Sequence, residues 1–205
     1  MDLNIRSIIG AKIRRKGPGR VGIVADFAEI SDDVSVRQAI SVLCKKGRLR
    51  RIVPGVFHYP RKIGALGIDA PPDPEAVARA VARRKGYVIA PSGPMAVNRL
   101  GLSAQVAGKL VFLTNGPDET FQLGKLTVSL CHRPAKQIRV GGTFEKAVVQ
   151  AILHIGPQGI NEEVRSRIGK LTSPARRIRL LRAADRVGDW AGEVIRSIAA
   201  TATGA

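Results

Sequence analysis

The sequence has 205 residues, enough for one large domain or two small ones. Lys and Arg number 34 against 16 Asp and Glu, which gives a net charge of +18, and 44% of the residues are hydrophobic. The apolar content excludes wholesale disorder, and the charge predicts a polyanionic partner, either nucleic acid or an anionic membrane surface. Residues 1–60 hold 12 basic and 5 acidic residues, and residues 61–205 hold 22 and 11, so both portions are basic.

Several classes of protein are excluded by the same inspection. No stretch approaches the ~18–20 apolar residues that a membrane span needs, and the first residues lack the basic-then-apolar layout of a signal peptide. Cys44 and Cys131 lie far apart and predict neither a disulfide scaffold nor a zinc finger, and three histidines leave little material for a metal site. We therefore expect a cytoplasmic protein with no membrane contact, no metal and no cofactor.

The first thirty residues predict a helix, a short strand and a second, short helix. Residues 3–16 form the first helix, because apolar side chains recur at intervals of three and four residues: Leu3, Ile5, Ile8, Ile9 and Ile13. Gly17-Pro18-Gly19 ends this helix. A strand over 21–24 and a helix over 26–30, with Phe27 facing inward, follow.

A third helix and a hairpin complete this region. We expect Ser35 to cap a helix over 36–46. One face of that helix is apolar, with Val36, Ala39, Ile40 and Leu43. The opposite face is polar, with Gln38, Ser41 and Lys45, and Arg37 lies on its flank. Residues 49–53 and 56–59 predict two strands around a tight turn at Pro54-Gly55.

This order of elements is that of a winged helix-turn-helix, which we assign to residues 1–60. Such a helix buries its apolar side and places polar side chains in the DNA major groove. The basic hairpin beside it contacts the phosphates of the DNA backbone. The predicted DNA-contacting residues are Arg20, Ser35, Arg37, Gln38, Ser41, Lys45, Arg48, Arg50 and Arg51. Two other interpretations remain open: the module mediates protein contacts, or the charges at 12–16 are simply a solvated helix end.

Catalytic motifs are not recognisable. Residues 17–22 match the G-x-G-x-x-G spacing, but a basic helix precedes them and a short strand follows, the reverse of a dinucleotide site. They predict a loop in which Arg20 can contact a phosphate. With no Walker motif, nucleophile elbow or metal-ligand cluster, we expect a protein that is not an enzyme and has no catalytic residue; a nuclease is the weakest alternative.

The rest of the chain predicts a linker over 61–74 and a mixed α/β domain over 75–205. The expected helices cover 74–85, 94–100, 144–155, 161–171, 174–184 and 186–199. The expected strands cover 87–90, 109–114, 121–123 and 126–131. The fold class is therefore α+β with a helical C-terminal end. An arginine-rich helix, with Arg176, Arg177, Arg179 and Arg182, is either a solvated face opposite Ile178 and Leu181 or an additional polyanion contact.

Several stretches resemble one known family. They are Ile5–Gly19, Gln38–Ser41 with Lys46–Arg51, Pro54–Pro60, Pro91–Gly93, Asn98–Ser103 and Val111–Gly116. Together they resemble the AbiEi-type antitoxins of bacterial type IV toxin–antitoxin (abortive infection) systems, over about residues 3–155. The likeness is most specific in the N-terminal region.

The resemblance implies a winged-helix domain that binds operator inverted repeats in double-stranded DNA and represses its own operon. It also implies a C-terminal domain that counteracts a cognate nucleotidyltransferase-like toxin, with or without direct contact. The recognition-helix positions would be Ser35, Arg37, Gln38, Ser41 and Lys45, and the wing positions Arg50 and Arg51. The alternative from another class is a basic RNA-binding or ribosome-associated protein, although only 4% aromatic residues leave few stacking platforms for bases.

Overall fold

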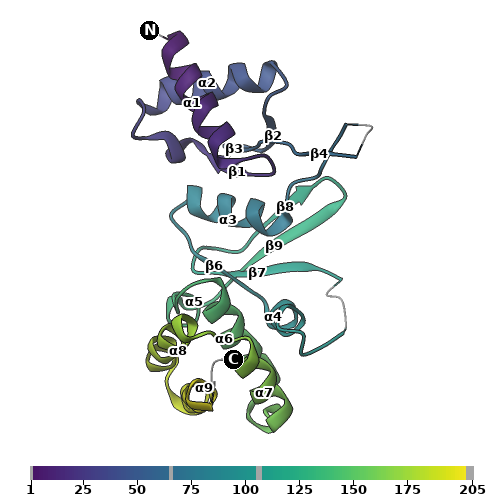
Figure 1. The fold of residues 1–205 in the computed structure, drawn as a ribbon, viewed down its shortest axis with the longest axis vertical. Coiled ribbons are helices and arrows are strands. Elements are labelled where there is room, and N and C mark those ends of the chain that lie inside the picture. The colour runs from purple at the N-terminus through teal and green to yellow at the C-terminus, as the bar shows by residue number, and fades with distance from the viewer. Residues whose placement is uncertain (1, 65–66, 105–107, 202–205) are drawn as a thin grey trace. The chain divides into compact units, whose positions relative to one another are not determined.

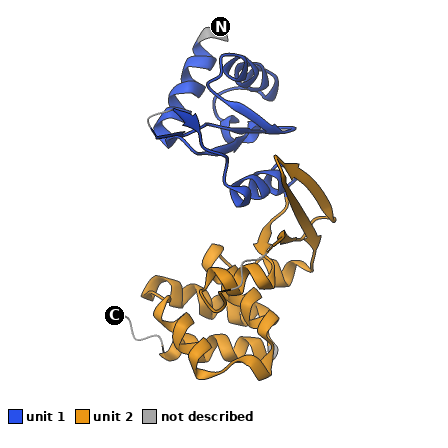
Figure 2. Ribbon diagram, turned by 90° about the vertical axis from the view of Figure 1, so that its right-hand side faces the viewer, with its two compact units in different colours: residues 1–86 blue, residues 87–205 orange. Residues whose placement is uncertain are grey.

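The computed structural model describes residues 2–64, 67–104 and 108–201 of a mixed α+β chain. The chain divides into two compact units, residues 1–86 and 87–205, coloured separately in Figure 2. Among the described helices, none has the length and apolarity to cross a membrane.

Two helices and a small antiparallel sheet form the beginning of the first unit (Figure 1). Its first part contains α1 (Asp2–Lys16), β1 (Val21–Ile23), the 3₁₀ helix η1 (Val24–Phe27), α2 (Asp33–Lys45), β2 (Arg50–Val53) and β3 (Val56–His58). The three strands are antiparallel in the order β1-β3-β2, so the strand that comes last in sequence lies in the middle. The predicted hairpin at Pro54-Gly55 is confirmed by the pairing of β2 with β3.

The core of this unit joins α1, η1 and α2 to the sheet. Its buried residues are Ile9, Ile13, Phe27, Val36, Ala39, Ile40, Leu43, Leu49 and Phe57. Ile8, predicted to share the buried stripe of α1, is instead 44% exposed. At 100° per residue it lies about 140° around the helix from Ile13, so it faces solvent when Ile13 is buried. The side chain of Leu3, also placed in that stripe, is outside the described part of the chain.

The start of α2 also differs from the sequence expectation, because Asp32 rather than Ser35 caps it. The Asp32 carboxylate accepts hydrogen bonds from the backbone N–H groups of Val34 and Ser35, both at 2.9 Å. A carboxylate reaches these free N–H groups and complements the positive end of the helix dipole, so it starts the helix three residues earlier than Ser35 would. Gly47, with φ +68°, follows the last turn, as expected of a helix end.

The first unit extends further than the predicted domain of residues 1–60. The stretch 61–74, expected to be a linker, contains a short hairpin of β4 (Lys62–Ile63) and β5 (Ile68–Asp69); residues 65–66 lie outside the description. Helix α3 (Pro74–Arg84), expected in the second domain, contacts β1 and β3 of the first. The side of α3 that is rich in alanine and valine is buried in this contact. Arg83 of α3 also pairs with Asp26 at 2.9 Å. Both contacts attach α3 to the first unit.

The second unit contains a four-stranded sheet and the C-terminal helices. Its strands are β6 (Ile89–Pro91), β7 (Leu110–Thr114), β8 (Glu119–Leu123) and β9 (Leu126–His132), in the order β6-β7-β9-β8. The pair β7–β9 is parallel and the other two pairs are antiparallel. The helices are α4 (Gly93–Arg99), α5 (Ala135–Ile138), α6 (Thr143–Ile155), η2 (Pro157–Gly159), α7 (Glu162–Lys170), α8 (Pro174–Val187) and α9 (Asp189–Thr201).

Helix α6 forms the centre of this unit, because its middle residues are almost completely buried. It packs against the sheet through β6 and against α4, α8 and α9, and Trp190 of α9 contacts the same core. The α+β expectation is confirmed, and the predicted elements of this part are present with ends shifted by at most three residues. Helix α5 was not predicted, because a single turn gives too short a pattern to recognise.

Candidate nucleic-acid interface

The outer face of α2 carries four of the nine predicted DNA-contacting side chains. Burial of Val36, Ala39, Ile40 and Leu43 turns the opposite side of the helix to solvent. Arg37, Gln38 and Lys45 are exposed, and Ser41 is half-buried. With the exposed Val34, these four side chains fall within an arc of about 100° around the helix axis. The structure therefore brings Arg37, Gln38, Ser41 and Lys45 together as one polar face, with an apolar residue at its start.

Arg37 has one carboxylate partner on this face. Its Nη2 atom lies 3.2 Å from Oδ2 of Asp33, one turn earlier, and both side chains are more than 60% exposed. An exposed pair with this i,i+4 spacing contributes only about 0.3–0.5 kcal/mol to stability. Arg37 can therefore exchange Asp33 for a phosphate or a base edge at little cost.

Ser35 does not join the outer face. Its hydroxyl donates to the second oxygen of Asp32 at 2.9 Å, and it lines a shallow hollow with Arg6 of α1. Hydrogen bonds from the Ser35 backbone N–H and hydroxyl hold the pKa of the Asp32 carboxyl below its usual value. Ser35 therefore acts on this interface indirectly, by fixing the start of α2.

The predicted basic residues outside α2 are in three different situations. Arg48, between α2 and β2, is exposed. Arg50 is tied to β5, because its Nη2 lies 2.9 Å from Oδ2 of Asp69, whose Oδ1 lies 2.6 Å from Nζ of Lys62. Arg51 is exposed on β2. Arg20 donates from Nε to the carbonyl oxygen of Lys16 at 3.1 Å, at the end of α1. It precedes β1, which β3 separates from β2 in the sheet.

One unusual residue behind this interface was not predicted to matter. His58 is only 1% exposed, and within the described structure neither ring nitrogen has a hydrogen-bond partner. Burial lowers its pKa, nearby Arg50 lowers it further, and Asp69 opposes both. His58 is buried because β3 is the central strand of the sheet, with β1 paired on one side and β2 on the other.

The second unit places its arginines differently from the sequence expectation. Ile178 and Leu181, expected to be buried, are 56% and 38% exposed, because α8 buries Leu180, Ala183 and Ala184 instead. Ile178 lies about 160° around the helix from Leu180. The four arginines therefore do not lie opposite a buried face formed by Ile178 and Leu181.

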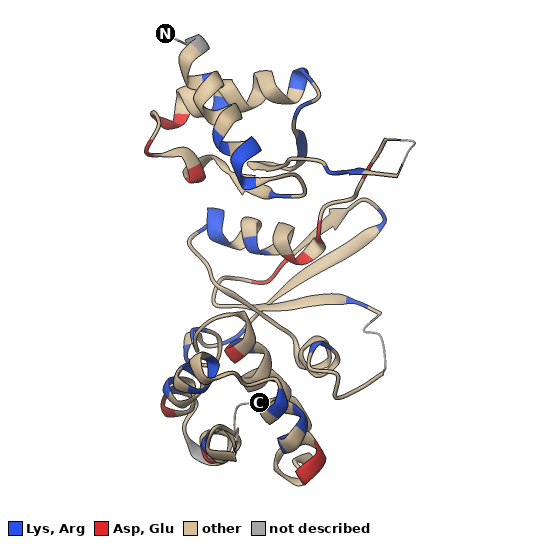
Figure 3. Ribbon diagram, viewed as in Figure 1, with Lys and Arg blue, Asp and Glu red and all other residues tan. Residues whose placement is uncertain are grey.

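Arg176 and Arg179 take part in the packing of the second unit. Arg179 Nε donates to Oε1 of Glu145 at 2.8 Å, and Glu145 is 1% exposed. Arg176 lies over the ring of Phe144, 4.3 Å from its centroid, and donates to the carbonyl oxygen of Leu171 at 2.7 Å. Figure 3 shows that Lys and Arg residues occur on both units.

The structure thus defines an α+β chain whose first unit presents a polar helix face beside a basic hairpin. Over residues 8–179 the sequence matches the model of a family described as a family of unknown function, DUF6088. The chain belongs to this family.

One solved structure has a low level of similarity to this chain. The crystal structure of the RV2827C protein from Mycobacterium tuberculosis is similar at 17% identity and a TM-score of 0.41, over 96% of this chain and 81% of that chain. A likeness at this level assigns no function. No match was found among curated proteins.

Proposed function

We propose that the protein is a sequence-specific DNA-binding repressor whose first unit is a winged helix-turn-helix, with α2 as recognition helix and the β2–β3 hairpin as wing. The observation that carries the proposal is the outer face of α2, where the exposed Arg37, Gln38 and Lys45 lie together with the half-buried Ser41. The order α1–β1–η1–α2–β2–β3 and the sheet order β1-β3-β2 support it.

The chemistry of this face suits the edges of base pairs. The Gln38 amide can pair with adenine, the Arg37 guanidinium with guanine, and the exposed Val34 can contact a thymine methyl group. Lys45 and Arg48 supply phosphate contacts, which add affinity without reading sequence. We expect Arg50 to contribute less to DNA affinity, because its guanidinium group already pairs with Asp69 and would have to bind a phosphate in addition.

We further propose that the repressor is an antitoxin of the AbiEi type. The resemblance of the N-terminal stretches supports this assignment, and it implies an operator of inverted repeats next to the protein's own operon. Two half-sites require two copies of the recognition helix, so two chains would bind one operator. The partner to be counteracted would be a nucleotidyltransferase-like toxin encoded beside it.

The test of DNA binding compares two labelled duplexes by fluorescence anisotropy at near-physiological salt: DNA from upstream of the protein's own gene, and a scrambled duplex of equal composition. We expect at least roughly a thousandfold preference for the upstream duplex. Equal affinity for the two duplexes would exclude sequence-specific repression. Tighter binding of single-stranded or structured RNA than of either duplex would favour the ribosome-associated alternative.

A single-residue comparison sharpens this test. Gln38→Ala is expected to cost about 1–3 kcal/mol at the base pair that it contacts and to relax base preference there. Gln158→Ala is the matched control, because Gln158 is an exposed glutamine on η2 of the second unit. If both variants kept the full preference, α2 would not be the recognition helix.

The antitoxin role is tested separately in cells. The adjacent nucleotidyltransferase-like reading frame is expressed with and without this chain, and growth is followed. We expect growth arrest only when this chain is absent. Arrest in both cultures would contradict the antitoxin assignment and leave the DNA-binding result standing.

A further inference from the structure

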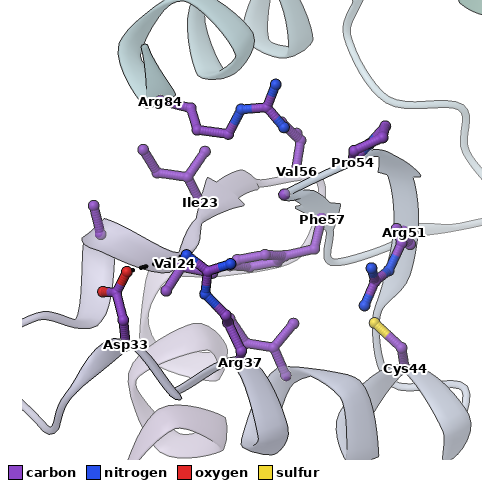
Figure 4. Close-up of a pocket in the computed structure, with 13 residues that line it drawn as sticks. Ile23, Val24, Asp33, Arg37, Cys44, Arg51, Pro54, Val56, Phe57 and Arg84 are labelled. Carbon is purple, nitrogen blue, oxygen red and sulfur yellow. Dashed lines mark hydrogen bonds and ion pairs between the residues drawn. The ribbon is translucent and has the colours of Figure 1, made fainter. Parts of the chain in front are cut away.

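A pocket lies in the first unit between α2, β1, η1, the β2–β3 turn and the end of α3 (Figure 4). Its volume is about 500 Å³, within the range of about 300–1,000 Å³ typical of small-molecule sites. Every residue that lines it belongs to residues 23–84.

The pocket combines an apolar floor with a cationic rim. The floor is formed by Ile23, Val24, Ile40, Val56 and Phe57. Three arginines line the pocket, and each comes from a different element: Arg37 from α2, Arg51 from β2 and Arg84 from α3. Figure 4 shows their side chains around Val56 and Phe57. Asp33 is the single carboxylate among the lining residues.

Two of the three guanidinium groups are available to a ligand. Arg37 already pairs with Asp33, whereas neither Arg51 nor Arg84 has a hydrogen bond or ion pair with any residue that the structure describes. The side chain of Arg84 lies against the turn at Gly55, where a Cβ atom would come within 2.8 Å of its Cδ. The turn therefore needs glycine for its φ of +74°, and the Arg84 side chain would have to shift to admit a Cβ atom there.

The neighbouring thiol does not neutralise this charge. Cys44 lines the pocket near Arg51, and burial raises the pKa of the thiol, although the charge of Arg51 acts in the opposite direction. A neutral thiol leaves three cations and one carboxylate around an apolar floor.

We propose that this pocket binds a small organic anion with an apolar body, such as a carboxylate, sulfonate or phosphate carried by an aromatic or branched aliphatic group. The guanidinium groups supply the paired N–H donors that such anions accept. The apolar floor gives the body of the ligand a surface on which to bury, and a bare phosphate would leave that surface empty. Binding is a property of the free protein, so the proposal does not depend on DNA recognition.

The experiment uses 1-anilinonaphthalene-8-sulfonate, a fluorescent anion of this class, and its uncharged analogue N-phenyl-1-naphthylamine. Each probe is titrated into the full-length protein. We expect saturable binding of the sulfonate at one site, and at least about tenfold weaker binding of the uncharged analogue, which corresponds to 1.4 kcal/mol. Equal affinity for the two probes, or no saturable binding of the sulfonate, would overturn the proposal.

Matched variants locate the bound anion. The double variant Arg51→Ala/Arg84→Ala is expected to weaken sulfonate binding at least about tenfold. Arg83→Ala is the control, because Arg83 adjoins Arg84 in α3 but pairs with Asp26 and does not line the pocket. Arg51→Lys/Arg84→Lys keeps the charge and is expected to retain part of the affinity. Equal effects of the Arg83 variant and the double alanine variant would place the anion elsewhere.

A competition arm separates an organic anion from a bare phosphate group. Inorganic phosphate is expected to displace the sulfonate probe only at concentrations far above that of the probe. Displacement at equal concentration would show that the site recognises phosphate alone and would overturn the requirement for an apolar body.

Discussion

The two units carry similar excesses of positive charge and use them differently. Residues 1–86 hold 18 basic and 8 acidic residues, and residues 87–205 hold 16 and 8. In the first unit, exposed cations lie on one face of α2 and on the segment that leads into β2. In the second unit, Arg176, Arg179 and Arg186 donate to a buried carboxylate or to backbone carbonyls of neighbouring segments.

This difference follows from the chemistry of the guanidinium group. Five N–H donors on a long stem let an arginine satisfy a helix end or a buried acid while part of it stays in water. Net charge therefore overstates, in both units, the number of cations that have no partner within the protein. Four predictions test how the two units differ, beginning with the largest expected effect.

The triple variant Arg37→Ala/Gln38→Ala/Lys45→Ala is expected to lose at least about 3 kcal/mol of operator affinity, because it removes both base-reading and phosphate contacts. Anisotropy with the upstream duplex measures this loss. The control Arg177→Ala/Arg182→Ala also removes two cations, from exposed positions on α8, and is expected to change affinity less than about threefold. Similar losses in both variants would show that the second unit binds DNA as well.

Arg179→Met is expected to destabilise the second unit by about 2 kcal/mol. It leaves Glu145 buried without a cation, but Arg179 is 48% exposed, so the cost falls below that of a fully buried pair. Urea unfolding followed by the fluorescence of Trp190, the single tryptophan, reports on this unit. Arg177→Met, two positions away, is expected to stay within about 0.5 kcal/mol of the parent. Equal destabilisation by the two variants would contradict a structural role specific to Arg179.

His58 predicts a pH dependence confined to the first unit. Its folded pKa lies below the unfolded value, so the unfolded state binds the proton more readily. Stability contributed by neutral His58 is therefore complete above the unfolded pKa, near 6.5, and declines as pH falls from there toward the folded pKa. The slope is at most about 1.4 kcal/mol per pH unit.

Hydrogen exchange at the buried amides of α1 measures that slope, and His58→Leu is expected to reduce it. The amides of α6 in the second unit serve as the internal control, since His132 and His154 are exposed. A slope that is unchanged in His58→Leu would assign the pH dependence to other groups.

The smallest expected effect concerns the Arg37–Asp33 pair. Asp33→Asn is expected to raise operator affinity about twofold at low salt, by freeing Arg37, and to change the free energy of unfolding by no more than about 0.5 kcal/mol. Asp185→Asn breaks a comparable exposed pair with Arg196 in the second unit and is expected to leave DNA affinity unchanged. If both variants bound DNA more tightly by the same factor, general charge rather than Arg37 would be responsible.

The individual helices, strands and turns of this protein can largely be predicted from its sequence. The apolar spacing of Val36, Ala39, Ile40 and Leu43 predicts both α2 and the side of it that is polar, because a 3.6-residue period fixes which side chains share a face. The turn at Pro54-Gly55 predicts the hairpin for a similar local reason. The α+β class and most element positions follow from such patterns.

Other features are decided by contacts between segments far apart in sequence. Sequence periodicity predicted that Ile178 is buried, but where α8 packs on α6 the buried face is the one that contains Leu180. The attachment of α3 to the first unit, the tie between Arg50 and Asp69, and the buried pair of Arg179 with Glu145 depend on tertiary partners. The charge of +18 can be read from the sequence, whereas the tertiary structure decided which cations have an acid or a carbonyl within reach, because such partners come from segments far apart in sequence.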